Sequence, residues 1–273
     1  MARFLFYFFV FILGVSLGSF LNSVTYRLEN NESFRGRSWC PNCKKKLSWF
    51  DLIPLFSFLI LKGRCRHCKL AISIQYPLVE LSTGLLFLLI TSHWSPISSF
   101  YGLGGLFFFW LVSCFLLIIF VYDLKHLIIP DKIVYPGIVI AFLYQLFGIF
   151  DLGFVSDFGF SISDLKPLAN SFLAALLVSG FFLAIVLISR GKWMGVGDVK
   201  LAFLMGLLLG FPGILVALFV AFFAGAIIGL GLIAFGKKSL KAEVPFGPFL
   251  VIGTFAQLLW GDEIIIWYFN LLL

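Results

Sequence analysis

The run YGLGGLFFFWLVSCFLLIIFVY at residues 101–122 contains no charged side chain and ends directly before Asp123. As an α-helix it is long enough to cross the hydrocarbon core of a bilayer, which takes about 20 residues. Similar runs recur along the 273 residues, of which 61% are hydrophobic and 12% charged. Such a chain cannot cover a water-soluble domain with polar side chains. The composition therefore excludes a soluble globular protein, an exported soluble protein and a disordered chain.

The apolar runs predict an all-α, polytopic membrane protein with about eight transmembrane helices. A transmembrane β-barrel would show short segments of alternating polarity, whereas these runs are continuously apolar. Pro212 and Gly213 predict a tight turn between the sixth and seventh spans. Residues 263–273 are apolar but too few to cross, and we expect them at the membrane interface. The predicted spans cover residues 4–22, 77–93, 101–122, 133–150, 167–189, 199–211, 213–235 and 246–260.

Basic residues are concentrated in alternate connections between these spans. Of the 20 Lys and Arg residues, only Arg3 and Lys166 lie outside segment 26–75 and the loops after the third, fifth and seventh spans. This distribution indicates membrane orientation by the positive-inside rule, rather than binding to nucleic acid. It places the N-terminus outside the cytoplasm and the basic segments inside. The last of these loops contains Lys237, Lys238 and Lys241.

The chain divides into three parts by composition. Residues 1–25 read as a retained first transmembrane helix, because the apolar stretch is longer than that of a signal peptide and a densely basic segment follows it. Residues 26–75 are polar, basic and rich in cysteine, which predicts a small cytoplasmic domain. Residues 76–273 form the membrane-embedded core. No internal repeat is evident.

Four cysteines of the 26–75 domain have the spacing of a zinc site with four thiolate ligands. Two disulfides or four free thiols are the alternatives, but the cytoplasm is reducing and disfavours disulfides. A site closed by four thiolates leaves no position for water, so the zinc would be structural. We expect His67 on the surface and Cys114, inside the third span, to be buried. The predicted ligands are Cys40, Cys43, Cys65 and Cys68.

Two carboxylates stand at the cytoplasmic ends of predicted spans. Asp123 closes the third span, and Asp198 precedes the sixth, where Gly195 and Gly197 would allow a substrate close to the backbone. Ionisable groups at such places are functional candidates. Two carboxylates that meet in a partly dry site tend to share one proton, so one can activate water while the other polarises a carbonyl. That is the chemistry of an aspartic peptidase. The structural alternatives are a solvated helix end for Asp123 and an N-cap for Asp198.

Two further acidic residues have less defined roles. Asp131 follows Pro130 at the start of the fourth span, which favours N-capping. Glu80 lies early in the second span, where it could pair with a basic residue of the cysteine domain. The sequence does not identify its partner.

Several motifs occur in a fixed order along nearly the whole chain. Together they resemble the bacterial type IV prepilin peptidase family, whose members are GxGD-type membrane aspartic peptidases and N-methyltransferases. The Gly-x-Gly-Asp motif alone is weakly specific, but it is strongly specific behind a tetra-Cys domain and an Asp-x6-Pro-Asp motif. The motifs are Gly18-Ser19-Phe20-Leu21-Asn22, Trp49-Phe50-Asp51-Leu52-Ile53-Pro54, Gly63-Arg64-Cys65-Arg66-His67-Cys68, Tyr76-Pro77-Leu78-Val79-Glu80, Asp123 with Ile129-Pro130-Asp131, Gly195-Val196-Gly197-Asp198-Val199-Lys200 and Pro245-Phe246-Gly247-Pro248.

The resemblance implies a site, a substrate and a cofactor. Asp123 and Asp198 would be the catalytic aspartates of an enzyme in the bacterial inner membrane. The substrates would be type IV prepilins or pseudopilins, cut on the cytoplasmic side between Gly and usually Phe. The enzyme would then methylate the new N-terminal amine with S-adenosylmethionine, and the cysteine domain is the candidate for this second activity. Gly63 is a candidate methyl-transfer residue, although a plain turn before Cys65 explains it equally well.

Two other functions fit parts of the sequence. The first is a peptidase of the same core that lacks methyl transfer. The second is a non-catalytic membrane scaffold or transporter with a zinc knuckle, which would place its polar residues around a cavity at the midplane. The short basic leader of a prepilin would be repelled by the basic domain, so we expect acidic groups such as Glu29 or Glu32 to contact it.

Overall fold

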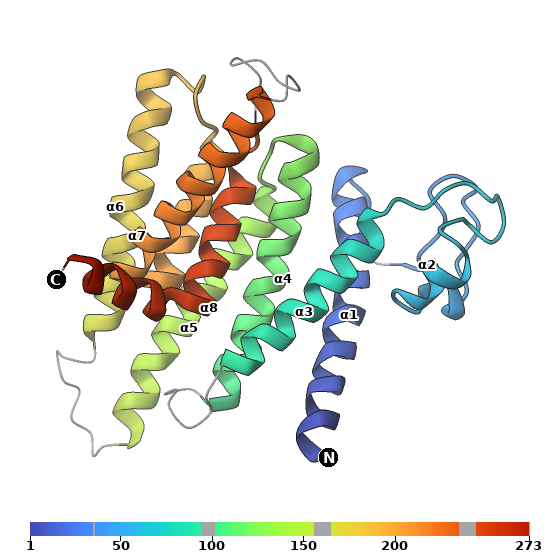
Figure 1. Ribbon diagram of the computed structural model, residues 1–273, viewed down its shortest axis with the longest axis horizontal. Helices are drawn as coiled ribbons and strands as arrows, with labels where there is room; N and C mark the ends of the chain where they lie inside the picture. The colour runs from blue at the N-terminus through green and yellow to red at the C-terminus, as the bar shows by residue number, and fades with distance from the viewer. Residues whose placement is uncertain (35, 94–101, 156–164, 235–243, 273) are drawn as a thin grey trace. The chain divides into compact units, whose positions relative to one another are not determined.

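The described part of the protein is helical (Figure 1). A computed structural model describes residues 1–34, 36–93, 102–155, 165–234 and 244–272. Within them, β-structure is limited to two isolated bridges, both in the cysteine domain. Arg35, Lys237, Lys238 and Lys241 of the basic segments lie outside the described residues. The elements are α1 (Ala2–Glu29), η1 (Trp49–Leu52), α2 (Phe56–Ile60), α3 (Gln75–His93), α4 (Gly102–His126), α5 (Asp131–Val155), α6 (Lys166–Ser189), α7 (Val196–Ala234) and α8 (Gly247–Leu272).

Five of the described helices are long and apolar enough to cross a membrane, namely α1, α4, α6, α7 and α8. The predicted fold class, an all-α polytopic membrane protein, is thereby confirmed. The predicted number of eight spans is not, because α3 and α5 fall outside this group and the sixth and seventh spans are parts of α7.

The chain forms two compact units, Met1–Ile118 and Ile119–Leu273. In the first unit, α1 packs against α3 through small residues four positions apart, Gly14 and Gly18. A Cβ on Gly14 would lie 2.9 Å from the Cα of Gly84, and one on Gly18 would lie 2.7 Å from the Cα of Glu80. Small residues let transmembrane helices approach this closely, where van der Waals contact and lipid release stabilise the pair.

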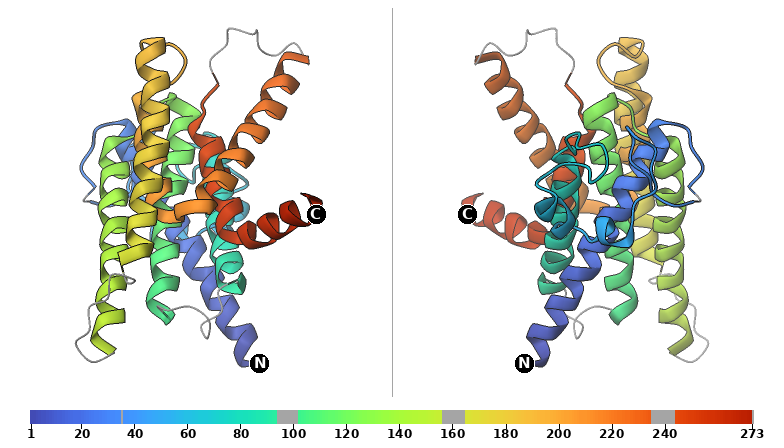
Figure 2. Two further views of the ribbon diagram at one scale, coloured as in Figure 1. Left: turned by 90° about the vertical axis from the view of Figure 1, so that its left-hand side faces the viewer. Right: turned by 90° about the vertical axis from the view of Figure 1, so that its right-hand side faces the viewer.

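In the second unit, α7 packs against α5, α6 and α8, and it is broken in the middle. Gly210 and Phe211 have non-helical dihedral angles, and Figure 2 shows the two pieces of α7 running in different directions. Carbonyl groups near the break are paired, because Gln145 donates to the Leu207 carbonyl at 3.0 Å and Asn170 to that of Phe211 at 2.8 Å. Such pairing permits irregular backbone at membrane depth.

Three helix boundaries differ from the prediction. The break in α7 lies at Gly210 and Phe211, just before the predicted turn at Pro212. Helix α4 continues past Asp123 to His126, so Asp123 does not close it. Helix α8 bends at Trp260 and remains helical to Leu272, so the predicted interfacial tail is a helix that turns from the rest of α8 (Figures 1 and 2).

Candidate functional site

Asp123 lies in the last turn of α4, and its side chain is only 4% exposed. The interpretation as a solvated helix end is therefore wrong. The backbone N–H of Gly247, the first residue of α8, donates a hydrogen bond to its carboxylate. A helix N-terminus carries a partial positive charge, so α8 stabilises negative charge at this position.

Asp198 lies in the first turn of α7, which begins at Val196. Gly195 therefore occupies the N-cap position, and the interpretation of Asp198 as the N-cap is wrong. The two residues are joined in both directions. The backbone N–H of Asp198 donates to the Gly195 carbonyl at 3.2 Å, and the backbone N–H of Gly195 donates to the Asp198 carboxylate. A carboxylate three residues after the N-cap commonly closes a helix start in this way. Asp198 is half-buried.

The two carboxylates meet in one site, where they are close enough to repel each other. The side chain of Ile129, in the loop between α4 and α5, lies between the supporting elements. A Cβ on Gly197 would lie 3.0 Å from the Ile129 Cβ, and one on Gly247 would lie 3.3 Å from its Cδ1. The ends of α4, α7 and α8 thus hold a carboxylate pair with one buried and one accessible member.

A pair of this kind has a defined chemical capacity. Two carboxylates that cannot easily both ionise in a poorly solvated site share a proton, so one acts as a base and the other as an acid. Asp198 is partly exposed and Gly195 is exposed, so solvent reaches one side of the pair. The predicted pairing of Asp123 with Asp198 agrees with this arrangement.

Asp131 is the first residue of α5, so Pro130 rather than Asp131 stands at the N-cap. Its carboxylate accepts a hydrogen bond from the Lys200 ammonium of α7 at 2.6 Å. The same ammonium lies 5.1 Å from the ring centroid of Tyr135, which adds a cation–π contact. Asp131 therefore links the starts of α5 and α7 instead of capping its own helix.

The four predicted ligand cysteines come together in the first unit. Their sulfur atoms all lie within 4.8 Å of one another, and the Sγ atoms of Cys40 and Cys68 are 3.9 Å apart. Zn–S bonds of about 2.3 Å place the sulfurs of a tetrahedral site about 3.8 Å apart. The cluster, Cys40, Cys43, Cys65 and Cys68, therefore fits a metal ion. His67 is exposed and Cys114 is buried, as predicted.

The two Cys-x-x-Cys turns have the same local structure. In each turn, the lysine that follows the second cysteine has a positive φ: 56° at Lys44 and 59° at Lys69. The backbone N–H of Lys44 donates to Cys40, and that of Lys69 donates to Cys65. Both turns have the sequence Cys-x-x-Cys-Lys. Backbone N–H groups of Cys68 and His67 lower the pKa of the Cys65 thiol to about 7, which favours the thiolate that binds a metal.

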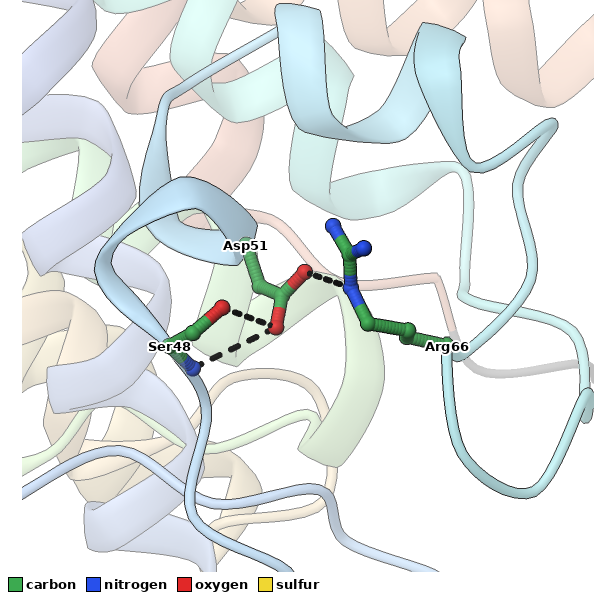
Figure 3. A network of polar contacts seen from close by, with 3 residues as sticks. All are labelled: Ser48, Asp51 and Arg66. Atoms are coloured by element: carbon green, nitrogen blue, oxygen red, sulfur yellow. Dashed lines mark hydrogen bonds and ion pairs between the residues drawn. The ribbon is translucent and has the colours of Figure 1, made fainter.

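An ion pair joins the two halves of the cysteine domain (Figure 3). The Arg66 Nε donates to the Asp51 carboxylate at 2.8 Å, and the Ser48 hydroxyl donates to its other oxygen at 2.6 Å. The Asp51 side chain is only 3% exposed. Partial burial opposes ionisation, but the hydrogen bonds from Ser48 and Arg66 prevail and lower the pKa of Asp51. The pair fixes the η1 turn against the second Cys-x-x-Cys turn.

Among the described residues, Glu80 pairs with no basic side chain, contrary to the prediction. Its carboxylate accepts a hydrogen bond from the backbone N–H of Leu55 at 2.8 Å and another from the Ser19 hydroxyl of α1. The side chain is 7% exposed. A backbone amide satisfies this buried group without a second charge, and the sequence gives no sign of which amide it is.

Gly63, the candidate methyl-transfer residue, has a φ of 67° and lies against the Phe58 ring. The turn before Cys65 thus requires a residue that tolerates this conformation.

The residues that sequence reasoning missed are Gly247 and Ile129, which support the carboxylates. The Pro245-Phe246-Gly247-Pro248 motif was the available signal, but it does not indicate what Gly247 contacts.

Comparisons with protein families match most of the chain. The family described as "Type IV leader peptidase family" matches residues 110–230, which include both aspartates. The family described as "Bacterial Peptidase A24 N-terminal domain" matches residues 12–94, which include the four cysteines. The two matches thus cover both the carboxylate pair and the cysteine cluster.

Individual relatives align over nearly their whole length. A prepilin leader peptidase/N-methyltransferase of Aeromonas salmonicida (strain A449) is 32% identical over 97% of this chain and 94% of its own. Proteins of the same name from Aeromonas hydrophila and Legionella pneumophila are 32% and 30% identical, over 95% and 96% of this chain and 92% and 94% of their own. No solved structure matches the chain.

Proposed function

Because the chain belongs to the type IV leader peptidase family, we propose that it removes the leader peptides of prepilins and pseudopilins and methylates the amine that cleavage releases. The membrane would be the bacterial inner membrane. The positive-inside pattern supports a periplasmic N-terminus, with cleavage and methyl transfer on the cytoplasmic side.

The observation that carries this proposal is the meeting of Asp123 and Asp198 in one site. In the proposed cleavage, the ionised carboxylate takes a proton from water as the water attacks the scissile carbonyl. The protonated partner donates to the carbonyl oxygen, and the leaving amine is protonated as the intermediate collapses. The N–H groups of Gly195 and Gly247 keep both carboxylates in place throughout. A non-catalytic scaffold would not need this pair.

Zinc is the metal that we propose for the cysteine cluster. Four thiolates in a tetrahedron are a common structural zinc site, and they leave no open position for catalysis. The cysteine domain has few buried apolar side chains of its own, since η1 and α2 contribute none. Metal binding would therefore supply much of its folding free energy.

S-adenosylmethionine would supply the methyl group, and the residues before the first Cys-x-x-Cys turn fit a polar ligand. Three buried polar atoms there have no hydrogen-bond partner among the described residues: Asn22 Oδ1, Glu32 Oε2 and Trp39 Nε1. Each of these atoms is available to a polar ligand or to water. Asn22 also donates to the Tyr76 carbonyl at 3.0 Å, and the Tyr76 hydroxyl interacts with Cys40.

The experiment is a single incubation of the purified full-length protein in detergent. The substrate is a prepilin peptide with its leader, supplied with S-adenosylmethionine, and the product N-terminus is analysed by mass spectrometry. The proposal predicts a product that begins after the leader and is heavier by one methyl group. Cleavage without the added mass of a methyl group would support the peptidase activity and refute methyl transfer. An intact substrate would refute the proposed function.

A further inference from the structure

The segment between the two Cys-x-x-Cys turns exposes large apolar side chains. Neither η1 nor α2 contains a buried residue. Trp49, Phe56 and Ile60 are 68%, 65% and 75% exposed, and the ring of Trp49 stacks on Phe50 with centroids 3.5 Å apart. Contiguous apolar groups of this size on a polar domain mark an interaction site. We define the 49–60 surface as Trp49, Phe50, Phe56, Leu59 and Ile60.

The 49–60 surface is fixed to α1 and α3 of its own unit. Leu55, immediately before α2, donates its backbone N–H to Glu80, which lies in the second turn of α3. Glu80 in turn is held against α1 by the Ser19 hydroxyl and the close approach of Gly18. Because Glu80 is held by Ser19 and Gly18 of α1, this contact places α2 beside a helix that is long and apolar enough to cross a membrane.

Helix α3 carries a stripe of exposed leucine side chains. Its exposed leucines recur at helical spacing along one side, and its opposite side packs against α1. An apolar stripe on the side that faces away from α1 is the kind of surface that acyl chains cover. The exposed Ile74, one residue before α3, continues the apolar surface back toward the cysteine domain. The stripe consists of Leu78, Leu81, Leu85 and Leu89.

The basic residues in the sequence around the 49–60 surface favour an anionic membrane as its binding partner. Residues 33–74 contain nine Lys and Arg residues and a single acidic residue, Asp51, which is already paired with Arg66. Apolar and aromatic side chains surrounded by basic ones are typical of segments that lie in the interface of an anionic membrane. A basic leader peptide would instead be repelled by the same charge.

We propose that Trp49, Phe50, Phe56, Leu59 and Ile60 insert into the headgroup region of the bilayer that α1 crosses, while the surrounding Lys and Arg side chains bind anionic phospholipid phosphates. The cysteine domain is then seated on the membrane. The domain would then lie at the membrane surface, where the new N-terminus of a membrane-anchored prepilin would emerge after cleavage. The lipid contact itself does not depend on the proposed function.

The test uses photocrosslinking in the full-length chain. The photoreactive residue p-benzoylphenylalanine replaces Ile60, and the protein is placed in nanodiscs of phosphatidylglycerol and phosphatidylcholine. Leu85 of the α3 stripe is the positive control, and the exposed polar residue Asn42 is the matched negative control. Unchanged metal content shows that each variant is folded. We expect lipid adducts at position 60 to be within about threefold of those at 85 and at least tenfold above those at 42.

Lipid adducts at position 60 no higher than at position 42 would overturn the proposal, as would crosslinks predominantly to a second copy of the chain or to added prepilin peptide. A second measurement needs no photoreactive residue. The emission of Trp49, obtained as the difference between the spectra of the wild type and Trp49→Phe, should be quenched by brominated phosphatidylglycerol. A difference emission that brominated lipid leaves unchanged would contradict the insertion of Trp49.

Discussion

The backbone N–H of Gly247 donates a hydrogen bond to the carboxylate of Asp123, although the two residues lie far apart in the sequence. A Cβ on Gly247 would lie 2.5 Å from the Oδ2 of Asp123 and 3.2 Å from its Cγ. No ordinary Cβ contact is this short, so any side chain at position 247 would displace the carboxylate or the start of α8. Gly247 is thus a positioning residue for Asp123.

Gly247→Ala should reduce leader cleavage by about 10²-fold, because a displacement of about 1 Å at a catalytic group costs that much. The measurement is the initial rate of leader release from a prepilin peptide in detergent. Gly229→Ala is the matched control, since a Cβ at that position of α7 would meet no described residue within 4 Å outside its own stretch of helix. A Gly247→Ala enzyme as fast as the Gly229→Ala control would show that this contact does not position the carboxylate.

The sequence predicts the position of α4 as a span but not the contact of Gly247 with Asp123. Apolar runs long enough for a bilayer identify α4 and its neighbours, because length and hydropathy are local properties. The helix end at His126 was missed, since a single charge at the interface does not stop a helix. The contact of Gly247 with Asp123 depends on how α4 and α8 pack, and no local pattern encodes it.

Asp51→Asn should weaken the cysteine domain. The carboxylate accepts hydrogen bonds from Arg66 and Ser48, and hydrogen bonds to charged groups contribute about 1.5–3 kcal/mol when they are shielded from water. Solvent screening at Arg66, which is 49% exposed, puts the expected cost at the lower end of that range. Transfer of zinc to a chelator at pH 7 should therefore be faster in Asp51→Asn than in the wild type.

The pH dependence of that difference follows from the pKa of Asp51. The folded-state pKa lies below the ordinary value of 3.8, so the contribution is complete above that value and is lost as the pH falls through the folded-state pKa. The wild type and Asp51→Asn should differ equally at pH 6 and pH 8. The double variant Asp51→Asn/Arg66→Gln should lose less than the sum of the single effects. Full additivity would contradict the ion pair.

The purified protein should contain one zinc ion per chain, measured by elemental analysis. Cys65→Ser should lose the metal, because it removes one of the four thiolates that meet in the cluster. Cys114→Ser should keep it, because Cys114 is buried in α4, outside the cluster. A metal-free protein as isolated, with four titratable thiols and unchanged folding, would refute the zinc assignment.

The cysteine ligands illustrate a second limit of sequence reasoning. Their spacing predicted the cluster, because each Cys-x-x-Cys turn places two sulfurs on one tight turn. The spacing did not reveal that Asp51 and Arg66 join the two turns, or that the Leu55 amide satisfies Glu80. Both contacts connect residues brought together by folding, and several other partners were chemically possible for each carboxylate.

Cleavage and methyl transfer should be separable. The aspartates lie in one compact unit and the cysteines in the other. Asp198→Asn, given a pre-cut peptide that begins with Phe, should therefore still incorporate methyl groups at a rate near that of the wild type. Cys65→Ser should lose methyl incorporation at least as severely as it loses cleavage. The experiment measures transfer of labelled methyl from S-adenosylmethionine. Loss of methylation in a folded, zinc-loaded Asp198→Asn protein would show that the two activities share one site.

The most direct test of the aspartate pair is the rate of leader cleavage by Asp123→Asn and Asp198→Asn, measured by mass spectrometry on one prepilin peptide. Each variant lacks one member of a pair that must supply both acid and base. The predicted loss exceeds the ~10²–10⁴-fold typical of a single general acid–base group, with membrane insertion and zinc content unchanged. Cleavage by either variant at close to the wild-type rate would contradict the catalytic role of that aspartate.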